Sequence, residues 1–273
     1  MSSQPVISVI IPAHNAAEYL EEAVVSVLQQ TYQGFEIIIV NHNSSDGTGI
    51  VAARLSQLDR RIRVFTLESS GSAAHSRNFG IRQANCEYVA FLDADDLWRK
   101  EKLWHQIEYY AEHPSASFIY SASLTFGSVS PFSPLYEVLP LPWKAAYSHE
   151  DLLRGNPVTC SSVLAKKQLI EEAGMFDENP ENKAEDYDLW LKLSRLSPPF
   201  FLPEILVDYR IHPQQFSGRD NTRADRLEYI RKKWGISAVY HASYRSNPFL
   251  RTARSLVHHG AVFLYKAGIV TYK

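Results

Sequence analysis

The chain has 273 residues, 45% of them hydrophobic, with a formal net charge of −2. This length can bury one substantial core, so we expect one main domain with at most an appendage. The two cysteines, Cys86 and Cys160, form no Cys-x-x-Cys pair, which argues against a disulfide scaffold or a thiolate metal site. A basic leader is missing and the first apolar run is only strand length, so we expect a soluble, cytoplasmic protein.

The first half of the chain alternates strand-like and helix-like patterns. Short apolar runs predict strands at residues 6–11 (ended by Pro12), 35–40, 63–65 and 88–92. Helical spacing of apolar residues predicts helices at residues 16–30, 47–58, 73–84 and 97–111. This alternation predicts an α/β fold with a Rossmann-like, doubly wound, mostly parallel sheet that binds ligands at the carboxyl ends of its strands.

The second half is less regular. Residues 127–142 are rich in Ser and Pro and predict a loop. Strands are expected at residues 158–164 and 204–211, and helices at residues 167–173 and 186–196. After Ser217 the chain becomes basic and aromatic, so we expect a basic helical extension over residues 219–273.

Positive charge is concentrated in that extension. From Arg223 to Lys273 there are ten Lys or Arg residues and only two acidic ones. A basic amphipathic helix suits an anionic membrane surface, which would place the protein peripherally at the inner face of the membrane. The same residues suit a helix packed on the main domain or a homodimer contact, and Tyr240, Tyr244 and Tyr265 favour packing. Only this extension favours nucleic-acid binding, and we expect no nucleic-acid partner.

Three carboxylates follow the strand predicted at residues 88–92. Asp93, Asp95 and Asp96 crowd four positions, and like charges this close raise one another's pKa unless a cation neutralises them. A hard divalent ion bound through one or two carboxylates, waters and substrate phosphates would do so. Asp96 could instead cap a helix that begins at Leu97, but one cap does not account for Asp93 and Asp95. The turn therefore predicts a metal–diphosphate site.

A second acidic cluster, Glu185-Asp186-Tyr187-Asp188, begins the helix predicted near residue 186. Acidic residues suit the first turn of a helix, whose buried stripe would be Leu189, Leu193 and Leu196. A carboxylate here could equally serve as the general base that takes a proton from an acceptor hydroxyl. The residues alone leave both interpretations open.

Four ordered segments together resemble the family-2 glycosyltransferases of GT-A fold, over about residues 5–218. They are VISVIIPAHNAAEYLEEAVVSVLQQTYQGFEIIIV, SGSAAHSRNFGIRQANCEYVAFLDADDLW, AGMFDENPENKAEDYDLWLKL and LVDYRIHPQQFS. The resemblance implies a GT-A catalytic domain at residues 1–218, with a nucleotide-binding half at about 1–112 and an acceptor half at about 113–218. The basic helical extension at residues 219–273 follows this domain.

The resemblance also implies a role for individual residues. Those implied to bind the nucleotide are Pro12, Ala13, His14, Asn15, His42, Asn43, Arg77 and Asp93. Those implied to hold a divalent metal, Mn²⁺ or Mg²⁺, are Asp95, Asp93 and His212. Asp186 matches the proposed catalytic base, and Glu185 beside it is expected to shape the acceptor site.

One position departs from the family pattern. After the second strand the family usually has two aspartates, the second of which accepts a hydrogen bond from the nucleotide base. This chain has Asn41 and His42 there. A neutral imidazole keeps one acceptor nitrogen, and protonation would remove it. The identity of the donor base is therefore open, and a decayed, inactive site is the alternative.

These observations predict an inverting, metal-dependent glycosyltransferase. It would move a sugar from a nucleotide-sugar donor to a saccharide or lipid-linked saccharide acceptor, in cell-surface polysaccharide or glycolipid synthesis. A non-catalytic nucleotide-sugar-binding module is the alternative. A nucleotidyltransferase is disfavoured because the loop at residues 12–15 has no glycine, and a dinucleotide-dependent oxidoreductase because no G-x-G-x-x-G follows the first strand.

Overall fold

The computed structural model describes residues 6–68, 72–127, 146–213 and 222–236. In these ranges the strands are β1 (Ile7–Ala13), β2 (Phe35–His42), β3 (Ile62–Leu67), β4 (Tyr88–Phe91), β5 (Leu97–Trp98), β6 (Phe118–Gly127), β7 (Leu164–Lys166) and β8 (Phe200–Ile211). The helices are α1 (Leu20–Leu28), α2 (Thr48–Leu58), α3 (Ala73–Gln83), α4 (Lys102–Glu112), α5 (His149–Leu153), α6 (Lys167–Glu172), α7 (Glu185–Leu196) and α8 (Thr222–Trp234), with a 3-10 turn η1 (Cys160–Ser162).

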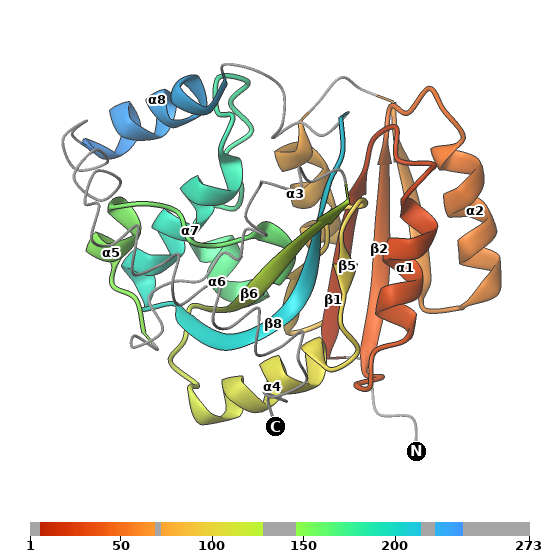
Figure 1. The fold of residues 1–273 in the computed structure, drawn as a ribbon, viewed down its shortest axis with the longest axis horizontal. Helices are drawn as coiled ribbons and strands as arrows, with labels where there is room; N and C mark the ends of the chain where they lie inside the picture. Colours follow the sequence, from red (N-terminus) through yellow and green to blue (C-terminus); the bar gives the residue numbers. More distant parts are fainter. Residues whose placement is uncertain (1–5, 69–71, 128–145, 214–221, 237–273) are drawn as a thin grey trace.

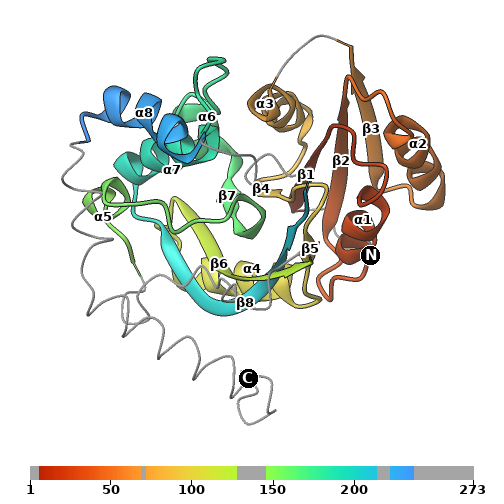
Figure 2. The ribbon, with the colours of Figure 1, turned by 45° about the horizontal axis from the view of Figure 1, so that its top comes forward.

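In the described chain the strands form one sheet, in the order β3-β2-β1-β4-β7-β6-β8-β5. Parallel pairing joins β3, β2, β1 and β4, and again joins β6 to β8. Strand β7 is antiparallel to both β4 and β6, and β5 is antiparallel to β8. The sheet curls, with β6 and β8 sweeping away from the β1–β3 end (Figure 2). This arrangement confirms the predicted α/β, mostly parallel, GT-A-type fold.

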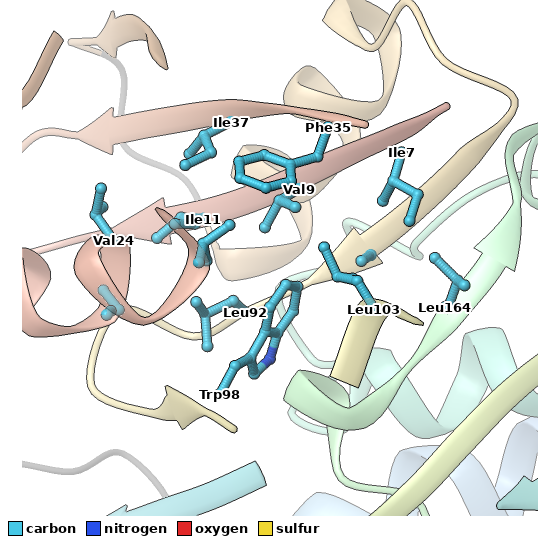
Figure 3. Packing of buried hydrophobic residues seen from close by; sticks show 14 of the residues in the cluster. Ile7, Val9, Ile11, Val24, Phe35, Ile37, Leu92, Trp98, Leu103 and Leu164 are labelled. Carbon is cyan, nitrogen blue, oxygen red and sulfur yellow. The ribbon is translucent and has the colours of Figure 1, made fainter. Parts of the chain in front are cut away.

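Helices cover both faces of the sheet (Figure 1). Alternate residues of β1 explain this, because Val9 and Ile11 pack with α1, α2 and α4, whereas Ile10 packs with α3 and α7 on the opposite face. Figure 3 shows the first of these clusters, in which Val24 of α1 and Trp98 of β5 lie against β1. Every residue of β2 is buried, as expected of a strand covered on both faces.

Helix α3 lies close against the sheet. A Cβ added to Gly80 would lie 2.6 Å from Cγ2 of Ile10 on β1, so no larger residue fits at this contact. Arg77 is one turn earlier on the same helix, and its guanidinium reaches Asp93, just after β4. The close packing of α3 therefore places a basic side chain beside the acidic turn.

Two predicted boundaries in the first half are wrong. Strand β1 continues through Pro12 to Ala13. The backbone carbonyl of Ile10 points toward β4, where it accepts the N–H of Leu92. The backbone of Pro12 points to the same side two residues later, but β4 has already ended there. The absent N–H of Pro12 therefore removes no ladder bond. The helix predicted from Leu97 begins only at α4, because Leu97 and Trp98 pair with β8 instead.

The second half holds further differences. The strand predicted at residues 158–164 is the 3-10 turn η1 followed by the three-residue strand β7. Strand β6 and helix α5 had no counterpart in the sequence prediction. Helix α7 forms as predicted, but Leu196 at its end is 42% exposed and does not belong to the buried stripe.

Parts of the sequence prediction lie outside the described residues. They are most of the loop predicted at residues 127–142 and the extension beyond residue 236. The part of the extension that is described, α8, packs on α7 rather than standing apart (Figure 1). Among the helices that the structure describes, none combines the length and apolar character that crossing a bilayer requires. Membrane contact, dimerisation and cellular location stay predictions.

Candidate active site

The candidate site lies at the carboxyl ends of β1, β2 and β4, which meet at one edge of the sheet. Two loops form its first part. His14 and Asn15 follow β1 and are exposed, and Asn43 follows β2. Ala13, at the end of β1, is only 1% exposed and belongs to the hydrophobic core.

Hydrogen bonds lock the two loops together. Nδ1 of His14 lies 2.7 Å from the carbonyl oxygen of His42. A carbonyl only accepts, so Nδ1 carries the proton and, in the neutral ring, Nε2 is the acceptor. The backbone N–H of Ser45 donates to Oδ1 of Asn15 at 2.8 Å. Asn15 and Asn43 have φ of 49° and 45°, a left-handed conformation that asparagine tolerates better than most residues.

His42 is 5% exposed and lies at the end of β2. Its Nδ1 is 2.9 Å from Oγ of Ser76 on α3. The ring of His75 is near as well, with its centroid 5.7 Å from that of His42. His42, which departs from the family pattern, therefore connects the loops after β1 and β2 to α3.

Helix α3 connects these loops to the acidic turn. Ser76 contacts His42, while the next residue, Arg77, donates through one terminal nitrogen to Oδ1 of Asp93 at 2.7 Å. Its other terminal nitrogen donates to Oε1 of Glu185 at 2.8 Å. Arg77 is buried, whereas the side chains of Asp93 and Glu185 are 29% and 18% exposed, so the ion pairs are only partly open to water. A single side chain thus joins the β4 turn to the start of α7.

The acidic turn is anchored by Asp96. The hydroxyl of Ser161 donates to Oδ2 of Asp96 at 2.6 Å, and the N–H of Arg210 donates to Oδ1 at 2.9 Å. Burial raises the pKa of Asp96 well above its usual range, and the neighbouring Asp95 and Asp93 raise it further. The suggestion that Asp96 caps a helix is wrong, because no helix begins at Leu97; Asp96 ties the turn to η1 and β8.

Asp95 faces His212, at the end of β8. Its Oδ2 lies 2.9 Å from Nε2 of His212. The ring of Tyr19 also packs against this imidazole, with centroids 4.7 Å apart. Burial raises the pKa of Asp95, and the charge of Asp93 adds to this effect. The pair therefore places one oxygen and one nitrogen donor beside the acidic turn, an arrangement that could accept a divalent cation.

The described residues contain no group of three or more His, Cys, Asp and Glu side chains placed to hold a metal ion. Asp93, the third predicted ligand, is engaged by Arg77. Asp95 and His212 are therefore the two side chains left that could hold a cation here, and an ion held by so few protein groups would also need substrate phosphates and water.

Asp186 lies in the first turn of α7, next to Glu185. Burial raises its pKa to about 7, Glu185 acts in the same direction, and Arg77 partly opposes them. Asp93 also contributes to the raised pKa. Asp186 therefore belongs to the same charged cluster as the β4 turn, and its carboxyl changes protonation near neutral pH.

Three residues of this cluster have no role in the sequence prediction. Ser161 offers no sequence signal, because it lies in the turn η1, where a strand was predicted. Arg210 directly precedes the Ile-His pair and could have been noticed; its Nε donates to the carbonyl of Asp95 at 2.8 Å. Cys160 is a buried free thiol whose pKa is raised well above its usual value by burial.

Comparisons with known proteins show the family of the chain. The profile for "Glycosyl transferase family 2" matches residues 8–172. The chain is 31% identical to the putative teichuronic acid biosynthesis glycosyltransferase TuaG of Bacillus subtilis, over 85% of this chain and 93% of that protein. An uncharacterized glycosyltransferase of Haemophilus influenzae is 29% identical, over 92% of this chain and 85% of that protein.

Many solved structures share the fold, S. aureus TarS and a mannosyltransferase of Pyrobaculum calidifontis among them. Residues 1–349 of S. aureus TarS in complex with UDP-GlcNAc have a TM-score of 0.66 at 20% identity, covering 83% of this chain. This chain spans 65% of the TarS chain. The mannosyltransferase PcManGT of Pyrobaculum calidifontis, in complex with GDP-Man and Mn²⁺, has a TM-score of 0.61 at 17% identity, covering 97% of this chain and 81% of that chain.

Proposed function

Because the chain belongs to glycosyl transferase family 2, we propose that this glycosyltransferase moves a sugar from a nucleoside-diphosphate donor to an acceptor hydroxyl, inverting the anomeric carbon. One observation carries the proposal. The guanidinium of Arg77 binds Asp93 on the β4 turn and Glu185 on α7, so the acidic turn and the carboxylate of Asp186 share one cluster. A sugar held at this cluster would have a diphosphate site on one side and a base on the other.

The nucleoside would bind over the loops that follow β1 and β2. The exposed His14 and Asn15, with Asn43 opposite them, present backbone and side-chain hydrogen-bonding groups at this edge. The related folds of TarS and PcManGT were solved with UDP-GlcNAc and with GDP-Man. A nucleoside-diphosphate sugar is therefore the donor class, and the buried His42 is the residue expected to decide between bases.

A divalent cation, Mn²⁺ or Mg²⁺, would bind at Asp95 and His212, with Asp93 nearby. When bound, such an ion stabilises the negative charge that develops on a leaving diphosphate. The raised pKa of Asp95 supports this assignment, because a cation would favour its ionised form. Arg210 would keep the turn in place through its hydrogen bond to the Asp95 carbonyl.

Asp186 would act as the general base. Its pKa of about 7 is matched to removing a proton from an acceptor hydroxyl at neutral pH. Glu185, held by Arg77, would shape the acceptor side. An inverting transfer needs only one such base and no covalent nucleophile.

The acceptor would be a saccharide or a lipid-linked saccharide of a cell-surface polymer. The similarity to TuaG, which is named for teichuronic acid biosynthesis, supports this class. An acceptor attached to a lipid would also account for the basic residues of the extension after residue 222.

The test uses the full chain with UDP-, GDP-, TDP- and CDP-sugars in the presence of Mn²⁺ or Mg²⁺. Thermal shift first identifies the donor, because a ligand specific for the folded state raises the melting temperature. Transfer or slow donor hydrolysis that Asp186→Asn abolishes, with donor binding retained, is the expected result. Donor binding without either reaction would instead support a non-catalytic binding module. Release of pyrophosphate from a nucleoside triphosphate and a sugar phosphate would indicate a nucleotidyltransferase.

A further inference from the structure

The C-terminal helix α8 is fastened to α7 through one buried carboxylate. Asp188 is fully buried, and both of its oxygens accept hydrogen bonds. Trp234 donates its indole N–H to Oδ1 at 2.8 Å, and Lys233 donates its ammonium to Oδ2 at 2.9 Å. Lys192 of α7 adds a third contact at 3.1 Å. A buried carboxylate is costly unless it has such hydrogen-bond partners, and α8 supplies two of the three contacts of Asp188.

Lys233 also reaches the segment before α7. Its ammonium lies 2.6 Å from Oδ2 of Asp177, which accepts a second hydrogen bond from the hydroxyl of Tyr229 at 2.7 Å. Burial raises the pKa of Asp177, but these hydrogen bonds outweigh it and lower the pKa to about 2. One ammonium therefore bridges two carboxylates, Asp177 ahead of α7 and Asp188 within it.

Helix α3 holds the opposite side of the same segment. The side chain of Asn78 donates to the carbonyl of Phe176 at 2.9 Å and accepts from its N–H at 2.9 Å. The preceding residue on α3, Arg77, holds Glu185 at 2.8 Å. Figure 2 shows α7 with α8 on one side and α3 on the other. The start of α7 is thus bound to α3 through Glu185 and to α8 through Asp188. Asp186 lies between these two residues in the sequence.

We propose that Lys233 is a positioning residue that sets the orientation of Asp186 by bridging Asp177 and Asp188. This inference rests on the proposed function, in which Asp186 is the general base. Lys233 does not touch the substrate. Trp234 still holds Asp188 and Arg77 still holds Glu185 without it, but only Lys233 among these three residues also ties Asp177 to Asp188, which limits movement of the first turn of α7. General-base catalysis depends on a proton-transfer distance, so a small rotation of this turn lowers the transfer rate without affecting the nucleotide loops on β1 and β2.

The kinetic test compares Lys233→Met, Lys233→Arg and Lys232→Met in the full chain. Lys233→Met should lower kcat by about 10- to 100-fold, while donor KM and donor Kd change less than about twofold. Lys233→Arg keeps a charged donor and should recover most of kcat. Lys232 is exposed and is the matched control, whose variant should behave as the wild type. Unchanged kcat in a folded Lys233→Met protein, or a parallel loss of donor binding, would overturn the proposal.

A second measurement does not depend on catalysis. Hydrogen exchange of the backbone amides at residues 188–192, which bond back into the first turns of α7, should be faster in Lys233→Met and close to the wild type in Lys233→Arg. Trp234→Phe removes one donor to Asp188 but keeps a ring, and should give a smaller change in the same amides. If the wild type transfers no sugar from any donor, the proposed function fails, whereas unaltered exchange in Lys233→Met specifically refutes the positioning role.

Discussion

Arg77 on α3 holds Glu185 on α7 at 2.8 Å, across 108 positions of the sequence. The same guanidinium binds Asp93 at 2.7 Å, so one buried fork fixes the geometry between the end of β4 and the start of α7. A sugar donor and an acceptor would meet between these two elements. The rigidity of the candidate site therefore depends on a side chain that touches neither the proposed base nor the proposed metal ligands Asp95 and His212.

The first prediction concerns this fork. Arg77→Lys keeps the charge but cannot bind two carboxylates with two parallel nitrogens. We expect a loss of about 2–4 kcal/mol in the free energy of unfolding, measured by urea denaturation, and a transfer rate lower by about 100-fold. Arg54→Lys is the control, because its pair with Glu21 has side chains 52% and 48% exposed, and should cost less than about 0.5 kcal/mol. Similar losses in both variants would show that the fork has no special importance.

The second prediction concerns the pH dependence of transfer. The pKa of Asp186 is raised to about 7, mainly by burial and then by Glu185. A general base must be deprotonated, so kcat/KM should rise with pH through about 7 and level off above it. Asp186→Asn should lose this rise together with nearly all transfer. A wild-type profile that is flat between pH 5 and 8 would remove Asp186 from the base role.

The raised pKa of Asp186 also predicts that the stability of the fold falls as the pH rises, whereas transfer increases. An acid whose pKa is higher in the folded state than in the unfolded state destabilises the fold once it must ionise. The cost should therefore grow as pH rises from about 4 to about 7 and stay constant above that. Because Asp186 is only partly shielded, we expect Asp186→Asn to be more stable than the wild type by about 1–2 kcal/mol at pH 8 and equal to it at pH 4. Thermal melts at both pH values measure this, and equal stabilisation at pH 4 would exclude an ionisation effect.

The sequence predicted the first half of the fold well for a physical reason. Strands β1 and β2 are runs of apolar, largely β-branched residues, and a strand buried on both faces needs little else. Strand β6 carries Ser121, Ser123 and Thr125 in buried positions, which hides it from a hydrophobicity pattern. Strand β5 has two residues and exists only because β8, more than a hundred positions later, pairs with it.

The candidate site also has one part that the sequence predicts and one part that it does not. Asp93, Asp95 and Asp186 were predicted as site residues from their local sequence and from the resemblance to the family. Contacts between distant segments, such as the one between Ser161 and Asp96, were not, because no local pattern encodes them. Asp96 was misread for that reason, since an aspartate before an apolar run looks like a helix cap until its partners are known.

A further prediction tests the metal assignment. Asp95→Ala should abolish the Mn²⁺-dependent part of nucleoside-diphosphate binding, measured by calorimetry with and without the metal, and leave the weaker metal-independent part unchanged. His212→Ala should reduce the same part by about 10-fold, as expected for loss of one ligand of a sparsely coordinated ion. Removing divalent ions with EDTA should stop transfer by the wild type, and added Mn²⁺ should restore it. Full transfer in EDTA would contradict the assignment.

The last prediction separates the anchor of the acidic turn from its ligands. Ser161→Ala removes the hydroxyl that donates to Oδ2 of Asp96 at 2.6 Å and that accepts the N–H of Asp93 at 3.1 Å. A buried carboxylate oxygen of Asp96 then lacks its hydrogen-bond partner, which should lower the free energy of unfolding by about 2 kcal/mol. The turn should also loosen, so that metal-dependent nucleotide binding weakens several-fold although no proposed ligand has changed.

Ser162→Ala is the matched control for this anchor. Ser162 is equally buried, but its hydroxyl donates to the nearby carbonyl of Thr159 at 2.7 Å and does not contact the acidic turn. The Ser162→Ala variant should lose about 1 kcal/mol in the free energy of unfolding and keep its metal-dependent nucleotide binding. Equal weakening of binding in both variants would mean that η1 acts only through general stability. Weakening in Ser161→Ala alone would mean that the contact between η1 and Asp96 sets the position of Asp93 and Asp95.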